Sequence, residues 1–324
     1  MLAWIIEIAV IFVAVVLAAS VYISWSTARK VERAVPPIGD FIEVDGARLH
    51  YLDRGEGSPI VMIHGLGGNL YHYAGTIFDD IASTGRAIAI DRPGCGYSER
   101  PAGYDFSTQA QANIIQKALD KLGVTDPLIV GHSLGGGVAL AHAVLHPGKA
   151  RGYVLIAPAA GKPRSIPPVF RKLHVSAPLR PVIAWTIGVP MSIKAGPQIT
   201  AEIFAPQSVP FDFATESGGL LALRPKSLIT NMNDFAASGS SFDRSRKRYD
   251  EINVPVLCLY GLGDRVLDPE FQLDALKPIP ALEVQRLDAA GHMLMHVEPK
   301  TVIAAIRKLD AQTAATAPGA GAMA

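Results

Sequence analysis

The chain has 324 residues, enough for a sizeable hydrophobic core and for one main α/β domain with an appendage. Its 30 Lys and Arg residues nearly balance 29 Asp and Glu residues, and no basic stripe with interleaved aromatic residues occurs. This balance excludes nucleic acid as an expected partner. The two cysteines, Cys95 and Cys258, are expected to be buried free thiols, with a disulfide as the alternative.

The first 25 residues stand apart from the rest, because residues 2–25 read LAWIIEIAVIFVAVVLAASVYISW and carry a single charge, Glu7. At ~1.5 Å per residue this segment is long enough to cross a bilayer. No Lys or Arg precedes it, whereas Arg29, Lys30 and Arg33 follow it. This asymmetry favours a retained single-pass anchor in the cell (inner) membrane, with the following domain on the cytoplasmic side.

Two alternatives to an anchor stay open. The small residues Ala18, Ala19 and Ser20 could end the apolar region of a signal peptide, and cleavage would then leave the protein secreted or periplasmic. The segment could also be a buried helix or a docking segment.

Residues 26–37 are expected to be a linker that the paired prolines of VPPIGD stiffen. Asp45-Gly46, between FIEVD and ARLHYLD, indicates a hairpin. The short apolar runs PIVMIHG, RAIAIDRPG, PLIVGHS, GYVLIAPA and PVLCLYG are typical of strands buried on both faces, and amphipathic segments separate several of them. The chain therefore predicts an α/β fold, a mostly parallel sheet flanked by helices with an antiparallel entry hairpin.

This alternation stops at residues 162–250, which contain many prolines and no strand-turn-helix rhythm. The segment is too long for a simple loop, so we expect a mainly helical cap that covers one edge of the sheet. The core then comprises residues 38–161 and 251–312, and residues 313–324 are expected to be a disordered tail.

The stretch LIVGHSLGGG contains the pattern G-x-S-x-G as Gly131, Ser133 and Gly135, where a buried strand is expected to turn into a helix. A serine on such a turn adopts strained backbone angles that expose its hydroxyl, which indicates a nucleophile. An anion formed there needs two backbone donors. We expect them to be the N–H groups of Leu134 and, in the earlier loop MIHGLGGN, of Leu66.

The nucleophile needs a base and a carboxylate that orients the base. Asp264 comes just after the strand-like run LCLYG, whereas Asp268 precedes Pro269 and is expected to cap a helix. Asp264 is thus the favoured carboxylate. In DAAGHMLMHVEP, His292 is the expected base, and His296, one turn further on, is expected to pack beneath the site or touch substrate.

The chain resembles the α/β-hydrolase superfamily from about residue 38 to about residue 312. The matching motifs are HGLGG (64–68), DRPGCGYSERP (91–101), GHSLGG (131–136), GLGDRVLDP (261–269) and AGHMLMHVEP (290–299). The resemblance implies the α/β-hydrolase fold and a catalytic triad in the order Ser133, Asp264, His292. Epoxide hydrolases and haloalkane dehalogenases share the first two motifs, but they carry an aspartate where this chain has Ser133.

A serine nucleophile makes acyl transfer the expected chemistry, a serine esterase or lipase acting on a small-molecule ester. A carbon–carbon bond hydrolase, a cofactor-free haloperoxidase or perhydrolase and, less favoured, a ligand-binding receptor stay open as alternatives. No metal or cofactor is expected, because CxxC, HExxH, the GxGxxG fingerprint and the phosphate loop are all absent from the sequence.

Substrate preference is expected to reside in the cap, whose apolar residues could line an acyl pocket or form the cap's own core. The candidates for substrate contact are Trp185, Met191 and Phe204. Behind a membrane anchor, a lipid-like or medium-chain ester is the favoured substrate class. The oligomeric state has no signature in the sequence.

Overall fold

The computed structural model describes residues 1–101, 103–163 and 168–314. Its centre is an eight-stranded sheet with the order β1-β2-β4-β3-β5-β6-β7-β8, in which β1 and β2 are antiparallel to their neighbours and the other strands are parallel. The strands are β1 (Asp40–Val44), β2 (Ala47–Arg54), β3 (Pro59–Ile63), β4 (Arg86–Ile90), β5 (Leu128–His132), β6 (Gly152–Ile156), β7 (Val256–Gly261) and β8 (Leu282–Leu287). The prediction of a mostly parallel sheet is confirmed.

The entry hairpin turns at the expected dipeptide. Val44 pairs with Ala47, and the two residues between them, Asp45 and Gly46, both have positive φ, of 49° and 76°. Such angles suit a two-residue turn whose twist matches that of the flanking strands.

Helices cover both faces of the sheet, because successive residues of each central strand point to opposite sides. In β5, Ile129 packs in one buried cluster together with helices α4 (Thr108–Lys121), α5 (Leu134–Leu145) and α9 (Pro269–Leu276). Leu128 and Val130 pack in a second cluster with α2 (Tyr71–Ala74), α3 (Phe78–Ala82), α10 (Leu294–Val297) and α11 (Pro299–Ala314). This arrangement buries the sheet on both sides and leaves its edge at the carboxyl ends of the parallel strands for the loops.

The cap leaves the core after β6 and rejoins it before β7, and it is helical as predicted. It comprises the 3₁₀ helices η1 (Pro168–Leu173), η2 (Ala177–Leu179), η4 (Gly219–Leu223) and η5 (Tyr249–Glu251), the α-helices α6 (Arg180–Ile183), α7 (Val189–Phe204) and α8 (Pro225–Arg246), and the π-helix η3 (Ala184–Gly188). Thr230 of α8 donates a hydrogen bond to the Gly94 carbonyl in the loop after β4, at 3.0 Å. The cap therefore covers the edge at which the parallel strands end.

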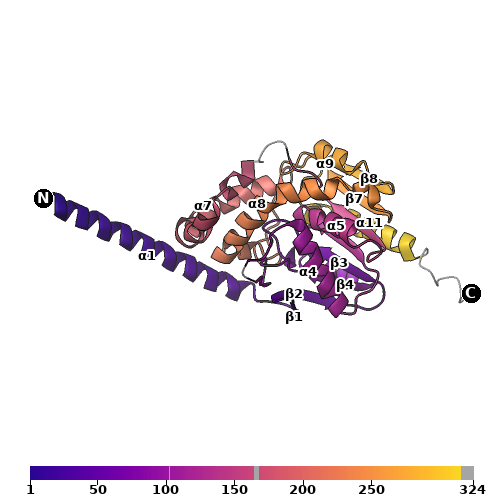
Figure 1. The fold of residues 1–324 in the computed structure, drawn as a ribbon, viewed down its shortest axis with the longest axis horizontal. Helices are drawn as coiled ribbons and strands as arrows, with labels where there is room; N and C mark the ends of the chain where they lie inside the picture. The colour runs from indigo at the N-terminus through magenta and orange to yellow at the C-terminus, as the bar shows by residue number, and fades with distance from the viewer. Residues whose placement is uncertain (102, 164–167, 315–324) are drawn as a thin grey trace, which may run out of the picture.

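The N-terminal helix α1 (Leu2–Ala34) projects from the body beside α7 and α8 (Figure 1). It is long and apolar enough to cross a membrane, and none of its most apolar 18-residue window is buried inside the body. The prediction of a linker from residue 26 is wrong, since the helix continues through residues 26–34, which contain neither Gly nor Pro, and ends just before Pro36-Pro37. At the other terminus, Thr313 and Ala314 belong to α11, so the predicted tail begins no earlier than residue 315; residues 315–324 lie outside the described residues.

Candidate active site

Ser133 occupies the turn between β5 and α5, with φ 52° and ψ −119°. Backbone bonds hold it there: its N–H donates to the Ile156 carbonyl at 3.0 Å, and its own carbonyl accepts from Gly136 and Ala159 at 2.9 Å each. A side chain at Gly131 would overlap the Gly135 carbonyl, and one at Gly135 would overlap the backbone of β3. The pattern G-x-S-x-G is thus required by the close approach of strand, turn and helix, and the positive φ of Ser133 is a strained angle for this residue type.

Asp264 and His292 come together from loops that follow β7 and β8. His292 Nδ1 lies 2.7 Å from Asp264 Oδ2, and both side chains are buried. The other oxygen of Asp264 accepts hydrogen bonds from the N–H groups of Val266 at 2.7 Å and Leu267 at 3.0 Å. The carboxylate is therefore fixed by backbone donors on one side and by the imidazole on the other.

Asp268 does not reach this pair. Its side chain caps α9 by accepting from the N–H groups of Glu270 at 3.1 Å and Phe271 at 3.3 Å, and Pro269 occupies the first turn, as predicted. In the structure, Asp264 therefore contacts His292, whereas Asp268 caps a helix.

His132 links the serine turn to the His292 loop. Its Nε2 lies 3.1 Å from the His292 carbonyl oxygen, and the two imidazole rings lie 4.8 Å apart between centroids. Because His132 immediately precedes Ser133, this contact sets His292 beside the serine turn. His132 is therefore a packing residue that contacts the ring and the backbone of His292.

The loop after β3, residues 64–68, lies against Ser133, since a Cβ placed on Gly65 would be 2.9 Å from the Ser133 Cβ. Leu66 of this loop packs against the cluster that contains Leu134. The two residues expected to donate their N–H groups to an anion therefore share one side of the turn. Their role as donors stays a prediction.

His64 and Arg92 stabilise this loop through hydrogen bonds. The Arg92 backbone N–H donates to His64 Nε2 at 3.0 Å, and its guanidinium donates to the carbonyls of His64 and Gly65 at 3.0 Å each. Burial, together with the Arg92 charge, lowers the pKa of His64 to about 3, so this imidazole stays neutral. His64 is a structural residue of the loop.

One residue in this region escaped sequence reasoning. Asp234 of the cap helix α8 pairs with Arg92 at 2.7 Å and with Arg100 at 3.0 Å, and its side chain and that of Arg92 are fully buried. Because 142 positions separate Asp234 from Arg92, no local pattern could have signalled the contact. Cys95 lies in the same loop, where burial raises the pKa of its thiol to about 11.

His296 lies in α10, one turn beyond His292; it is half-buried, with both ring nitrogens shielded from solvent. Its ring packs edge-on against Phe204, Phe213 and His72, at centroid distances of 5.4 to 5.7 Å. Neither ring nitrogen has a hydrogen-bond partner, and burial lowers the pKa of His296 to about 3. The surroundings of His296 are those of a neutral packing residue.

The three cap candidates for substrate contact do not lie together. Phe204 is fully buried against His296, whereas Trp185 and Met191 are exposed on the surface of the cap. The expectation that these two line a pocket is not met, because η3 and the start of α7 turn that face away from the core. Apolar side chains next to Ser133 come from other positions: the cluster around Leu134 contains Phe242 and Val266, with Phe170 packed against it.

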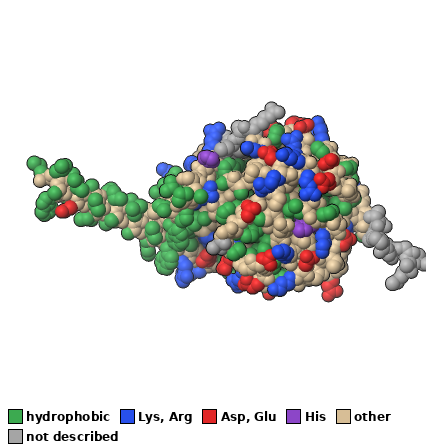
Figure 2. All heavy atoms as spheres, viewed as in Figure 1, with side chains coloured by type: hydrophobic (Ala, Val, Ile, Leu, Met, Phe, Trp, Pro, Cys, Tyr) green, Lys and Arg blue, Asp and Glu red, His purple; other side chains and the backbone are tan. Residues whose placement is uncertain are grey.

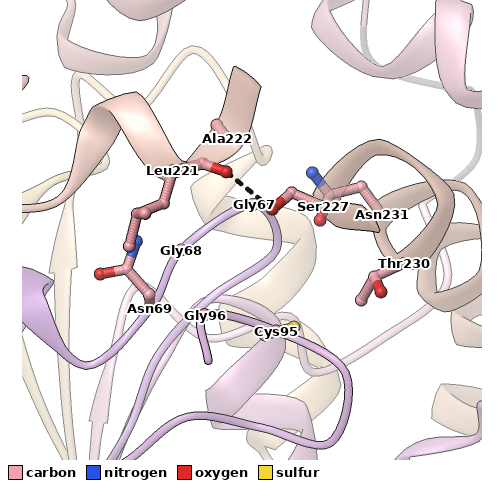
Figure 3. A pocket seen from close by; sticks show the side chains of 10 residues that line it. All are labelled: Gly67, Gly68, Asn69, Cys95, Gly96, Leu221, Ala222, Ser227, Thr230 and Asn231. Carbon is pink, nitrogen blue, oxygen red and sulfur yellow. Dashed lines mark hydrogen bonds between the residues drawn. The ribbon is translucent and has the colours of Figure 1, made fainter. Parts of the chain in front are cut away.

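A small cleft lies where the cap meets the loops after β3 and β4 (Figure 3). Its walls are Gly67, Gly68, Asn69, Cys95, Gly96, Leu221, Ala222, Ser227, Thr230 and Asn231. Across it, the Ser227 hydroxyl donates to the Leu221 carbonyl at 2.7 Å, within the cap itself.

Comparison with known proteins identifies this arrangement. A family model described as alpha/beta hydrolase fold matches residues 58–180, which include the serine turn and the loop after β3. A solved structure described as a membrane phospholipase A superposes with a TM-score of 0.69 at 19% identity, covering 97% of this chain and 98% of that chain. The chain has the α/β-hydrolase fold.

The curated proteins to which this chain is similar include enzymes of different chemistry. A 2-hydroxymuconate semialdehyde hydrolase of Pseudomonas sp. (strain CF600) is 38% identical over 123 residues, which cover 37% of this chain and 44% of the relative. A cis-3-alkyl-4-alkyloxetan-2-one decarboxylase of Shewanella oneidensis is 25% identical over 291 residues, 84% of this chain and 88% of the relative. The first match thus spans less than half of that relative's length.

Proposed function

We propose that this α/β-hydrolase is a membrane-anchored serine hydrolase that cleaves carboxylic esters through an acyl-enzyme intermediate. The observation that carries the proposal is the buried Asp264–His292 pair at 2.7 Å, placed beside the strained turn that presents Ser133. A nucleophile, a base and an orienting carboxylate are the parts that acyl transfer by serine needs.

In the proposed reaction, Ser133 Oγ attacks the ester carbonyl carbon while His292 Nε2 takes its proton, because Nδ1 is engaged by Asp264. The N–H groups of Leu66 and Leu134 stabilise the oxyanion. The protonated His292 then gives its proton to the leaving alcohol, and the C–O bond breaks. Water, deprotonated by the same imidazole, releases the acid and restores Ser133.

The apolar cluster around Leu134 supports a lipid-like or medium-chain acyl group. Phe242, Val266 and Leu267 are buried there, and Phe170 and Ile203 of the cap pack against them. Turnover of p-nitrophenyl esters of increasing chain length by the full chain in detergent tests this. We expect kcat/KM to rise from acetate to medium chains, since each buried methylene contributes about 0.8 kcal/mol; a preference for acetate with loss above butyrate would count against it.

Membrane anchoring through residues 2–25 belongs to the same proposal. The helix α1 is apolar and exposed from Leu2 to Ala19, and Arg29, Lys30 and Arg33 follow the apolar stretch. This favours a retained single-pass anchor with a cytoplasmic catalytic domain; a cleaved signal and a periplasmic domain are the alternative. Fractionation with intact-mass measurement separates them, because a soluble form that lacks about 20 residues would exclude the anchor.

Carbon–carbon bond hydrolysis is the second candidate, favoured by the similarity to a 2-hydroxymuconate semialdehyde hydrolase. The same triad would serve it, so the substrate decides. Turnover of 2-hydroxymuconate semialdehyde with kcat/KM above that of every ester in the series would replace the ester proposal with this one.

A further inference from the structure

Exposed apolar side chains outside α1 are concentrated on one part of the cap. The described residues beyond α1 expose eight large hydrophobic side chains, and seven of them belong to the cap. The eight are Leu179, Val182, Trp185, Ile187, Met191, Ile193, Phe211 and Val284. Contiguous exposed apolar surface of this kind marks a contact with a membrane or another molecule. The first six, from residues 179–193, are called the cap face below.

As the proposed membrane span, the helix α1 determines where the bilayer lies relative to this cap face. Trp4 lies near the outer end of the helix, and Tyr22 and Trp25 lie together at the inner end, with ring centroids 6.0 Å apart. Aromatic residues at both ends are typical of a membrane span. The rise from Trp4 to Trp25 is about 32 Å, close to the thickness of the hydrocarbon core.

The cap first contacts α1 at a residue that lies nearer the centre of the proposed membrane span than Trp25 does. Residues 1–19 are exposed, Ser20 is the first half-buried residue, and Ser24 is fully buried. The helix α1 packs against η3, η4, α7 and α8, all of them elements of the cap. Contact that begins at Ser20 lies about 7 Å nearer the bilayer centre than Trp25, within the ~5–10 Å depth at which interfacial helices lie.

The charge pattern of the cap face fits lipid. Residues 181–193 contain no charged side chain, and Arg180 and Lys194 flank them. Figure 2 shows hydrophobic side chains gathered on the body where α1 joins it, with basic side chains around them. An apolar stripe between cations suits acyl chains below and anionic headgroups at the edge.

We propose that the cap face is a second membrane contact, inserted into the interfacial layer of the bilayer that α1 spans. It rests on the proposed anchoring by α1. The helix α7 begins at the cap face with Val189 and ends with Phe204, buried against His296, and the following Ala205 carbonyl abuts Gly291 beside His292. One helix therefore joins the lipid surface to the catalytic loop, which directs the active site towards esters that reside in the membrane.

The three tryptophans of the chain allow a direct test on the full protein. W4F with W25F leaves Trp185 as the single fluorophore, and W4F with W185F leaves Trp25 as the matched control. Both variants are reconstituted in phosphatidylcholine and phosphatidylglycerol vesicles with lipids brominated near the carbonyl or near the methyl end of the acyl chains. We expect loss of Trp185 emission with carbonyl-end bromine, less loss with methyl-end bromine, and protection from aqueous iodide.

The outcomes separate this inference from the anchor. Quenching of Trp25 by brominated lipid without quenching of Trp185 would overturn the cap-face contact and leave the anchor standing. Absence of quenching for both would overturn the anchor and the cap face together. Protection of Trp185 from iodide and from brominated lipid alike would point to a second copy of the chain on the cap face and would overturn the lipid assignment.

A functional arm uses Val182→Asp and Ile187→Asp, with Val284→Asp on β8 as the control at an exposed apolar position outside the cap. We expect the two cap variants to lose about tenfold or more of their turnover of an ester embedded in vesicles, the effect of about 1.4 kcal/mol of lost insertion. Turnover of a short soluble ester should stay unchanged in all three. Equal losses on both substrates would contradict the proposal.

Discussion

At the scale of single residues, the tasks of neighbouring side chains follow from the backbone groups around them. Asp264 accepts from two backbone N–H groups and faces His292, whereas Asp268 Oδ1 accepts from two N–H groups in the first turn of α9. Asp264→Asn is expected to lower kcat about 10⁴-fold, because an amide cannot hold the imidazole in the productive tautomer.

Asp268→Asn is the matched control, since Asn caps helices as well as Asp does. Its kcat should equal that of the wild type, as measured on the preferred p-nitrophenyl ester. A larger loss of kcat for the Asp268 variant than for the Asp264 variant would show that Asp268, not Asp264, orients the base.

The two histidines of α10 and its preceding loop differ in the same way. His292→Ala should reduce kcat by a factor of about 10³ or more, because it removes the proposed base. His296→Phe should leave kcat within about twofold and hold or raise stability, since both ring nitrogens of His296 are buried without a partner. Steady-state kinetics and chemical unfolding of the two variants check this, and the reverse ranking in kcat would move the base to His296.

These residue assignments were accessible from the sequence because each depends on a local signal. The glycines around Ser133, the proline after Asp268 and the dipeptide Asp45-Gly46 each restrict the backbone within a few positions. The contact of His132 with His292 was not accessible, since it joins the end of β5 to a loop 160 positions further on.

At the scale of elements, the cap is fastened to the core by buried charge. Asp234 of α8 forms ion pairs with both Arg92 and Arg100, so Asp234→Ala should cost about 3–5 kcal/mol of unfolding free energy by removing the carboxylate that these cations share. Asp243→Ala, an exposed position on the same helix, should change it by about 0.5 kcal/mol or less.

Urea unfolding in a fixed detergent measures both variants. Equal effects of the two substitutions would show that the buried pair does not hold the cap.

The cap as a helical insertion was predictable from its length and prolines, but the exposure of Trp185 and Met191 was not. An apolar residue in a helix has the same sequence signature whether it faces a pocket or a membrane.

At the scale of the whole molecule, buried neutral histidines make stability depend on pH. Burial lowers the pKa of His64 and His296 to about 3 and that of His72 to about 4. The unfolded chain binds protons at these positions below about pH 6.5, whereas the folded chain does not, so stability falls as the pH drops from 6.5 towards 4. At pH ~5 each such histidine lowers the unfolding free energy by roughly 2 kcal/mol.

Urea midpoints across this pH range measure the effect, and His296→Phe should flatten the dependence by removing one titrating group. A midpoint that stays constant or rises on acidification would contradict this account of the histidines.

The sequence predicted the fold class but not the order of the strands in the sheet. Alternating buried strands and amphipathic helices indicate a mostly parallel sheet, yet the pairing of β6 with β7 across the whole cap is set by tertiary packing. The extension of α1 to Ala34 was missed because the basic residues after the apolar stretch resemble a linker as much as a helix.

The most direct test of the central claim is covalent labelling of the full chain with a fluorophosphonate probe. We expect the wild type to be labelled once, on the peptide that contains Ser133, and Ser133→Ala to remain unlabelled while unfolding at the wild-type urea midpoint. Labelling that survives Ser133→Ala, or a folded wild type that takes no label, would contradict the assignment of Ser133 as the nucleophile.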